Sequence, residues 1–368
     1  MTDPRPQPGI LDISAYVPGE SGAGGPAKPI KLSSNESALG ASPKALAAFR
    51  QSAETLHLYP DGGALALKQA IARSYDLDPA RIICGAGSDE LLTLLATAYL
   101  GPGTEALMTE HAFLIFKIAT QASGATPVLV PERNLTTDVD ALLARVTERT
   151  RMVFLANPNN PTGTVIPLSE VRRLHRALPG HVVLVLDAAY ADYVRDTDYT
   201  AGFELVAEAG NVVVTRTFSK ALGLAGLRLG WAYGPPAVID VLNRIRTAFN
   251  VSAPAQAAGM AALADRAHVA AAVAHNDRWL PWLAQELKGL GLAVTPSVCN
   301  FHLVIFPADP ARNAAEAYAF LKSRHIYLRP VGAYGLGHTL RLTVGTGEEN
   351  QAVIAALADF MNTKDVPR

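Results

Sequence analysis

Short segments that are almost wholly apolar recur along the first two thirds of this 368-residue chain, and most are followed by a polar turn and a helical pattern. Strands that are apolar at every position, rather than alternately, are buried on both faces. The repeated alternation of strand and helix therefore predicts an α/β fold, in which helices cover both faces of a mostly parallel, seven-stranded sheet. The seven predicted strands are 81–84, 105–109, 126–130, 152–156, 182–186, 212–215 and 229–233.

The pattern changes after Pro254, where a long alanine-rich helix is predicted from about 255 to 290. Strands and helices then alternate without the earlier glycine-rich turns, which indicates a separate α+β unit. A chain of this length exceeds one ordinary hydrophobic core, so two domains are expected. We predict an N-terminal arm rich in proline and glycine, a large domain and a small C-terminal domain, over residues 1–41, 42–254 and 255–368.

Charge and composition disfavour several classes of protein. The formal net charge of -1 gives no electrostatic reason to expect nucleic acid or an anionic membrane as a partner. The apolar segments are too short to cross a bilayer. Cys84 and Cys299 are far apart, and the nine histidines show no ligand spacing. We therefore expect a cytoplasmic protein with no disulfide framework and no metal site.

Chemically active side chains follow three successive strands of the prediction. Lys220 follows the sixth strand, Asp187 the fifth and Asn160 the fourth. The carboxyl ends of parallel strands converge at one edge of a sheet, where open α/β sheets bind ligands, so we expect these residues to line one pocket. A lysine whose pKa is lowered by its surroundings can form an imine with a carbonyl group.

These residue types match the needs of pyridoxal phosphate. Lys220 would hold the cofactor's aldehyde as a Schiff base, and the carboxylate of Asp187 would keep the pyridine nitrogen protonated. Asn160 and Tyr190 would donate hydrogen bonds to the ring oxygen, and Phe113 would stack on the ring. The candidates on the phosphate side are Ser88 and Asp89 at a helix start, the hydroxyls of Thr217 and Ser219, and the cation of Arg228.

Each of these residues also has an ordinary structural interpretation. Taken singly, Lys220 is most simply a surface lysine, Asp187 a helix cap and Asn160 a turn former. A dinucleotide-binding oxidoreductase built on residues 85–87 is disfavoured, because no third glycine and no acidic ribose partner follow at the required positions. A DNA-binding regulator is disfavoured because the arm is short and poor in basic residues. The combination at three strand ends favours the cofactor site.

The run 160–163 (Asn-Pro-Thr-Gly), Asp187 with Tyr190, and Ser219-Lys220 with Arg228 eight positions later resemble the signature of class I/II aminotransferases of fold type I. The resemblance covers nearly the whole chain. It implies transamination dependent on pyridoxal phosphate, in which the freed lysine moves a proton as general acid and base. The segments most similar to histidinol-phosphate aminotransferases are 32–36, 59–61, 87–90 and 340–346.

That closer resemblance implies histidinol phosphate as amino donor in histidine biosynthesis, and 2-oxoglutarate or glutamate as partner substrate. It implies a homodimer with shared active sites, in which Tyr59 reaches the cofactor phosphate of the other subunit and the arm packs on that subunit and on the small domain. Arg329 and Arg341 would bind the anionic ends of the substrates. Tyr16 and Asn35 would also contact substrate.

The chain departs from the family pattern at Leu58, at Ser37-Ala38 and at His111-Ala112. None of these departures removes a group that the cofactor needs. They leave the substrate open between histidinol phosphate and an aromatic amino acid. A related decarboxylase of phosphorylated amino acids also stays open as an alternative.

Overall fold

The computed structural model of the chain describes residues 4, 6–7, 9–22 and 29–362. Its larger sheet has seven strands in the order β2-β8-β7-β6-β5-β3-β4. Strand β8 runs antiparallel to both of its neighbours, and the other adjacent pairs are parallel. The predicted α/β fold is confirmed. The strands are β2 (Ile82–Gly85), β3 (Glu105–Thr109), β4 (Thr126–Val130), β5 (Thr150–Ala156), β6 (Val183–Asp187), β7 (Val212–Thr217) and β8 (Gly230–Tyr233).

Helices are needed on both faces of this sheet because both faces are apolar. Along β7, Val212 and Val214 join one hydrophobic cluster, whereas Val213 joins another. Successive side chains of a strand point to opposite faces, so a run of valines supplies both cores at once. Helix α2 (Leu65–Tyr75) precedes the first strand of this sheet. The helices that follow its strands are α3 (Ser88–Tyr99), α4 (Leu114–Ala122), α5 (Val139–Leu143), α6 (Leu168–Ala177), α7 (Phe203–Glu208) and α8 (Pro236–Ile245).

The predicted single helix over 255–290 is wrong, because the chain forms α9 (Ala253–Ala264) and α10 (Arg266–Gly289) with a break at Asp265. Asp265 has a non-helical backbone (φ -95°, ψ 60°). Its carboxylate accepts a hydrogen bond of 2.6 Å from Ser42 Oγ. Ser42 is also the N-cap of α1 (Pro43–Ser52), and its hydroxyl accepts from the backbone N–H groups of residues 44 and 45. A contact between distant residues therefore ends α9.

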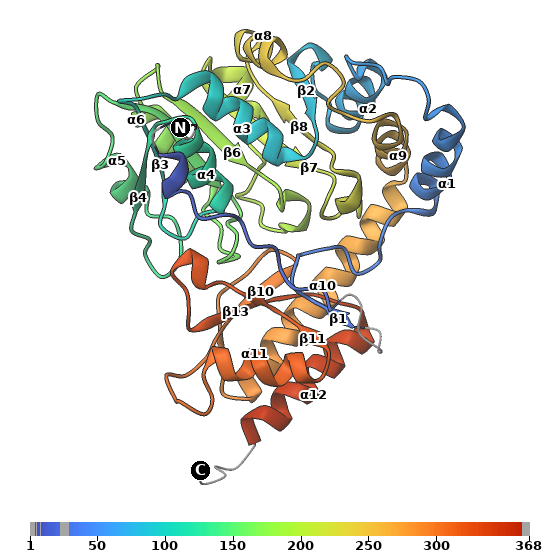
Figure 1. The fold of residues 1–368 in the computed structure, drawn as a ribbon, viewed down its shortest axis with the longest axis vertical. Coiled ribbons are helices and arrows are strands. Elements are labelled where there is room, and N and C mark those ends of the chain that lie inside the picture. Colours follow the sequence, from blue (N-terminus) through green and yellow to red (C-terminus); the bar gives the residue numbers. More distant parts are fainter. Residues whose placement is uncertain (1–3, 5, 8, 23–28, 363–368) are drawn as a thin grey trace.

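The smaller unit is built on a four-stranded antiparallel sheet in the order β12-β13-β10-β9. Figure 1 shows it below the larger sheet, with α10 running between the two units. Strand β1, which lies within the predicted arm, pairs with β11 and so joins the arm to this unit. The bounds are β1 (Ile30–Lys31), β9 (Ala293–Val294), β10 (Phe301–Ile305), β11 (Ile326–Tyr327), β12 (Arg329–Pro330), β13 (Thr339–Thr343), α11 (Ala314–Ser323) and α12 (Gly347–Asn362).

The described part of the arm contacts both units. Its 3₁₀ helix η1 packs against α4, and Glu20 forms an ion pair of 2.7 Å with Lys322 of α11. Parts of the predicted arm and the last six residues of the predicted small domain lie outside the described residues. Among the helices described, none has the length and apolar character to cross a membrane. The 3₁₀ helices are η1 (Ile10–Asp12), η2 (Ala53–Thr55), η3 (Pro79–Arg81), η4 (Ala191–Tyr193), η5 (Ala225–Leu227) and η6 (Gly332–Tyr334).

Candidate active site

A cavity of about 240 Å³ lies at the carboxyl edge of the seven-stranded sheet. Its walls come from the turns after β5, β6 and β7, the start of α3, strand β13 and the segment after β1. The structure thus brings together most of the side chains predicted from the sequence: Tyr16, Asn35, Ser88, Asp89, Phe113, Asn160, Asp187, Tyr190, Thr217, Ser219, Lys220, Arg228 and Arg341.

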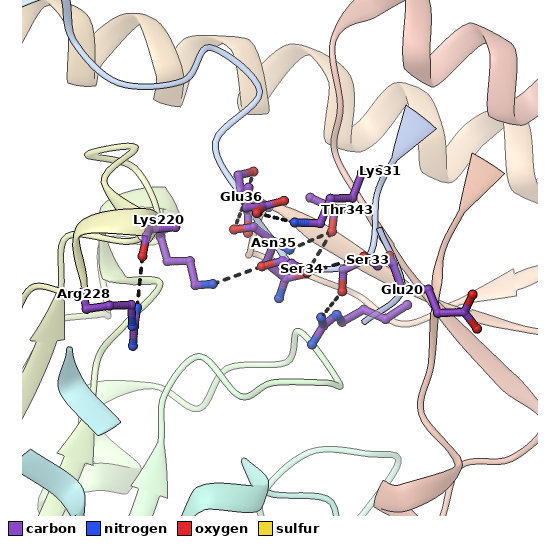
Figure 2. Close-up of polar contacts among 12 residues, drawn as sticks. Glu20, Lys31, Ser33, Ser34, Asn35, Glu36, Lys220, Arg228 and Thr343 are labelled. Carbon is purple, nitrogen blue, oxygen red and sulfur yellow. Dashed lines mark hydrogen bonds and ion pairs between the residues drawn. The ribbon is translucent and has the colours of Figure 1, made fainter. Parts of the chain in front are cut away.

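Lys220 projects into this cavity from the turn after β7. Its Nζ donates a hydrogen bond of 3.4 Å to the carbonyl oxygen of Ser34 (Figure 2). The same atom lies 5.6 Å from the ring centroid of Tyr190. Desolvation by the surrounding protein, together with the nearby positive charge of Arg341, lowers the pKa of Lys220 to about 8. A larger share of neutral amine follows at physiological pH, which suits a nucleophile.

Asp187 ends strand β6 and is buried at the base of the cavity. Its neighbour in the sheet register is Thr215 of β7, whose Oγ1 donates a hydrogen bond of 3.0 Å to Asp187 Oδ1. Burial raises the pKa of Asp187 to about 7, although the hydrogen bond from Thr215 opposes the shift. A carboxyl group that titrates near neutrality can share a proton with a basic ring nitrogen.

Tyr190 is held by a chain of hydrogen bonds that joins the two units. Asn35 Nδ2 donates to Tyr190 Oη at 2.8 Å, and Thr343 Oγ1 donates to Asn35 Oδ1 at 3.0 Å. The backbone N–H of Asn35 also donates to Thr343 Oγ1, at 3.0 Å. Burial raises the pKa of Tyr190, so its phenol stays protonated and can donate.

Arg341 enters the cavity from β13 and is only 6% exposed. Its Nη1 donates to Asn160 Oδ1 at 2.5 Å, and its Nη2 donates to Ser33 O at 2.8 Å. Its Nε is buried and has no hydrogen-bond partner among the described residues. Arg341 therefore does not face solvent, as an arginine in a half-buried antiparallel strand commonly does. A buried guanidinium with a donor to spare is suited to an anion.

The start of α3 and Arg228 form a cradle for a further anion. Gly87 precedes the helix with φ +90°, and a Cβ atom at this residue would overlap Arg228 Nη2. A Cβ atom at Gly230 would likewise overlap the backbone nitrogen of Ser88. Glycine at both positions therefore lets the guanidinium and the N–H groups of the helix start lie side by side. Helix N-termini and arginine both favour phosphate.

Arg228 reaches this place with a left-handed backbone, at φ +51°. Its Nη1 donates to Ser219 Oγ at 3.4 Å, and its Nη2 lies 3.3 Å from Asp89 Oδ2. Thr217 Oγ1 accepts from the backbone N–H of Ser219 at 3.1 Å. The two hydroxyls and the cation therefore lie on one side of the cavity, with Asp89 as the counter-charge.

Phe113 also lines the cavity and immediately precedes α4. Its ring makes an edge-to-face contact with Phe116, with ring centroids 5.9 Å apart. This contact fixes an aromatic surface next to the cavity, as a ring-stacking residue requires.

Arg329 and Tyr59 lie outside this cavity. Arg329 lines an adjacent cavity of about 320 Å³, and its Nη2 donates to Val17 O at 2.6 Å. Tyr16 belongs to the walls of both cavities, and its ring centroid lies 5.5 Å from Arg329 Cζ. Tyr59 is 82% exposed and stacks on Phe249, with ring centroids 4.5 Å apart.

Sequence reasoning missed several polar residues that support the site. Ser34 accepts from Lys220, Thr215 donates to Asp187 and Thr343 fixes Asn35. Residue 343 lies in the segment 340–346, but its partner Asn35 is 308 positions away in the sequence. The position of Thr215 opposite Asp187 depends on the sheet register, which an apolar run does not reveal.

The fold and the cavity together define the class of protein. The chain belongs to the class I and II aminotransferases, because the sequence pattern of the family described as "Aminotransferase class I and II" matches residues 27–357. The predicted family is confirmed.

Individual relatives are similar over their full length. The chain is 57% identical to a histidinol-phosphate aminotransferase of Paramagnetospirillum magneticum, over 98% of this chain and 99% of that protein. It is 55% identical to one from Rhodopseudomonas palustris strain BisB18, with the same coverage. The crystal structure of histidinol-phosphate aminotransferase from Sinorhizobium meliloti in complex with pyridoxal-5'-phosphate matches with a TM-score of 0.89 at 30% identity, over 98% of this chain and 99% of that chain.

Proposed function

We propose that this protein is a cytoplasmic aminotransferase dependent on pyridoxal phosphate, which transfers the amino group of histidinol phosphate to 2-oxoglutarate in histidine biosynthesis. The observation that carries the chemistry is the cavity that joins Lys220, with its pKa of about 8, to the buried Asp187 and to Arg341. The relatives from Paramagnetospirillum and Rhodopseudomonas support histidinol phosphate over an aromatic amino acid or a decarboxylation.

The cavity residues fit this cofactor. The cradle formed by the start of α3 and Arg228 suits a phosphate, because glycine at position 87 lets the guanidinium lie beside the N–H groups of the helix start. Asp187 would hold the proton of the pyridine nitrogen, and Phe113 would stack on the ring. When bound, pyridoxal phosphate supplies an electron-withdrawing ring that stabilises negative charge on the substrate carbon. The remaining contacts would come from Tyr59, Ser88, Asp89, Asn160, Tyr190, Thr217 and Ser219.

Lys220 would be the general acid and base. As a neutral amine it takes a proton from the substrate carbon, and as the ammonium it returns one. The carbonyl of Ser34 accepts a hydrogen bond from this amine and keeps it directed into the cavity. Asp187 lies at the base of the same cavity and would set the charge of the ring nitrogen.

The two neighbouring cavities suggest how the substrates lie. Arg341 would bind the anionic group next to the reacting carbon, since its Nε is buried without a partner among the described residues. Arg329 would face a more distant anionic end through the wall formed by Tyr16. Asn35, which holds Tyr190, would position both substrates. Both donor and acceptor carry anions, so the arginines would serve each in turn.

We also propose that the active molecule is a homodimer with shared sites. Apolar side chains are exposed around Tyr59, among them Leu56, Leu58 and Phe249. Contiguous exposed apolar surface of this kind is typical of an interface. Tyr59 lies outside the cavity of its own chain and would reach the cofactor phosphate of the partner subunit.

Two measurements test the chemistry and the substrate. In purified protein, Lys220→Ala should lower transamination of histidinol phosphate by about 10²–10⁴-fold or more, because the general acid and base is lost. The half-reaction of the unaltered protein should be followed with histidinol phosphate, phenylalanine and tyrosine in turn, by the visible absorbance of the bound cofactor. Near-normal turnover in the variant would contradict the role of Lys220. Faster reaction with the aromatic amino acids would overturn the substrate.

A further inference from the structure

Glu36 lines the cavity but has no part in the proposed cofactor contacts. The other two carboxylates of the cavity have partners within it or beside it: Asp89 lies near Arg228, and Asp187 accepts from Thr215. Glu36 forms an ion pair of 2.6 Å with Lys31, which is not part of the cavity wall. Figure 2 shows Glu36 on the same short segment as the Ser34 carbonyl that faces Lys220.

The backbone around Glu36 is held firmly in place. Asn300 is buried, and its Nδ2 donates to the carbonyl oxygens of Asn35 and Glu36 at 3.1 and 3.2 Å. Asn35 is in turn fixed by Thr343. The side chain of Glu36 is 44% exposed, which places its carboxylate at the open side of the cavity rather than in its base. A binding group needs this kind of rigid support.

A carboxylate at this position has an electrostatic consequence. The proposed substrates are anionic, and Lys220, Arg228 and Arg341 supply the positive charges that would attract them. A negative group in the same cavity repels anionic substrates. The exception is a substrate that places a positive or N–H-donating group beside it. Of the proposed substrates, the donor carries such a group on its ring and 2-oxoglutarate does not.

We propose that Glu36 determines donor specificity by accepting a hydrogen bond from a ring N–H of the donor. The site would thereby select a nitrogen heteroaromatic ring over a phenyl ring. Its affinity for the donor would rise further when that ring is protonated. The ion pair with Lys31 neutralises part of the charge of the carboxylate and so limits its attraction for free cations. The inference rests on the proposed function, whose donor carries an imidazole.

The test compares the ratio of kcat/KM for histidinol phosphate to kcat/KM for phenylalanine in the holoenzyme. Glu36→Gln keeps the size of the side chain and removes its charge, so the ratio should fall about tenfold, the usual loss for a hydrogen bond to a charged group. KM for 2-oxoglutarate should stay the same or fall, because a repulsive charge has gone. A merely structural role would instead raise KM for both substrates.

Two further variants sharpen the result. Glu148→Gln removes an exposed carboxylate before the amino end of β5, far from the cavity, and should leave the ratio unchanged. Lys31→Met removes the ion pair but keeps the Glu36 carboxylate, so the ratio should equal or exceed that of the unaltered protein. A fall as large as that in Glu36→Gln would mean that the ion pair, and not the carboxylate, sets the ratio.

The outcomes separate this inference from the proposed function. If the unaltered protein shows no preference for histidinol phosphate over phenylalanine, the proposed function and the inference are both contradicted. If the preference exists and survives in Glu36→Gln, only the inference is wrong. A tenfold lower ratio with an unchanged or lower KM for 2-oxoglutarate supports it.

Discussion

Lys220 and Asp187 carry opposite charges, yet the same cavity moves both pKa values toward neutrality. Desolvation disfavours the charged form of either group, which lowers the pKa of the amine to about 8 and raises that of the carboxyl to about 7. Near physiological pH each group can therefore exist in both protonation states. Groups poised in this way are typical of proton-transfer sites.

The pKa of Lys220 predicts how fast the protein without cofactor takes up pyridoxal phosphate. Only the neutral amine is nucleophilic, and with a pKa of about 8 its share rises from about one tenth at pH 7 to about nine tenths at pH 9. The uptake rate should therefore rise through this window and level off above it. Stopped-flow absorbance of the bound cofactor measures the rate. A profile that keeps rising beyond pH 10 would show an ordinary lysine.

At the scale of elements, the apolar runs predicted all seven strands of the larger sheet. Burial on both faces leaves little room for polar residues in six of them, whereas the edge strand β4 is buried only at Val130. The direction of β8 and the break between α9 and α10 could not be predicted. The first depends on the pairing of β8 with both β2 and β7, and the second on the contact between Asp265 and Ser42. Neither contact is local in sequence.

The residues of the site also divide into those that local sequence patterns predict and those that depend on contacts between distant segments. Asp187, Asn160 and Lys220 were found because each follows a strand, and parallel strands end at one edge. The contact of Arg341 with Asn160 joins residues 181 positions apart in different units. That contact depends on how the two units pack, which the pattern of a single strand does not contain. The resemblance to a family pointed to Arg341, and periodicity alone did not.

The turn after β7 gives a prediction at the element scale. Gly223 has φ +70°, its N–H donates to Lys220 O at 2.9 Å, and a Cβ atom here would overlap the carbonyl oxygen of Gly40. Gly223→Ala should lower the free energy of unfolding by about 2–4 kcal/mol, from left-handed strain and overpacking together.

Urea denaturation measures this loss, and the same loop offers a control. A Cβ atom at Gly226 would meet no neighbouring atom within 4 Å, so Gly226→Ala should change stability little. If both variants lost the same free energy of unfolding, the loss would come from the loop in general and not from the contact with Gly40.

At the scale of the whole molecule, the arm and the segment after β1 tie the two units together around the cavity. Arg329 binds the carbonyl of Val17, and Arg341 binds that of Ser33. Both arginines therefore serve as structural links and as proposed anion-binding groups. A change in how the two units pack would therefore move the proposed anion-binding groups and alter substrate binding.

The proposed dimer predicts complementation between two defective variants. Tyr59→Ala should weaken cofactor binding at least about tenfold, through loss of a hydrogen bond to a charged group. Mixed with Lys220→Ala, it can form heterodimers in which one site has both its own lysine and the partner's tyrosine. After refolding together, equal amounts should recover roughly one quarter of the normal activity at limiting cofactor. No gain over the separately refolded variants would mean that Tyr59 does not act across an interface.

Arg228 holds its place with a backbone conformation that glycine or asparagine adopts more easily, at φ +51°. Glycine here would relieve local strain and leave the sheet intact, while the positive charge beside the start of α3 would vanish. Under selection for folding alone, this arginine would therefore be replaced by other residues. Its presence is a trade-off in which the chain gives up some stability to keep a charge. In a library screened for expression rather than for growth, position 228 should be among the first in the site to change.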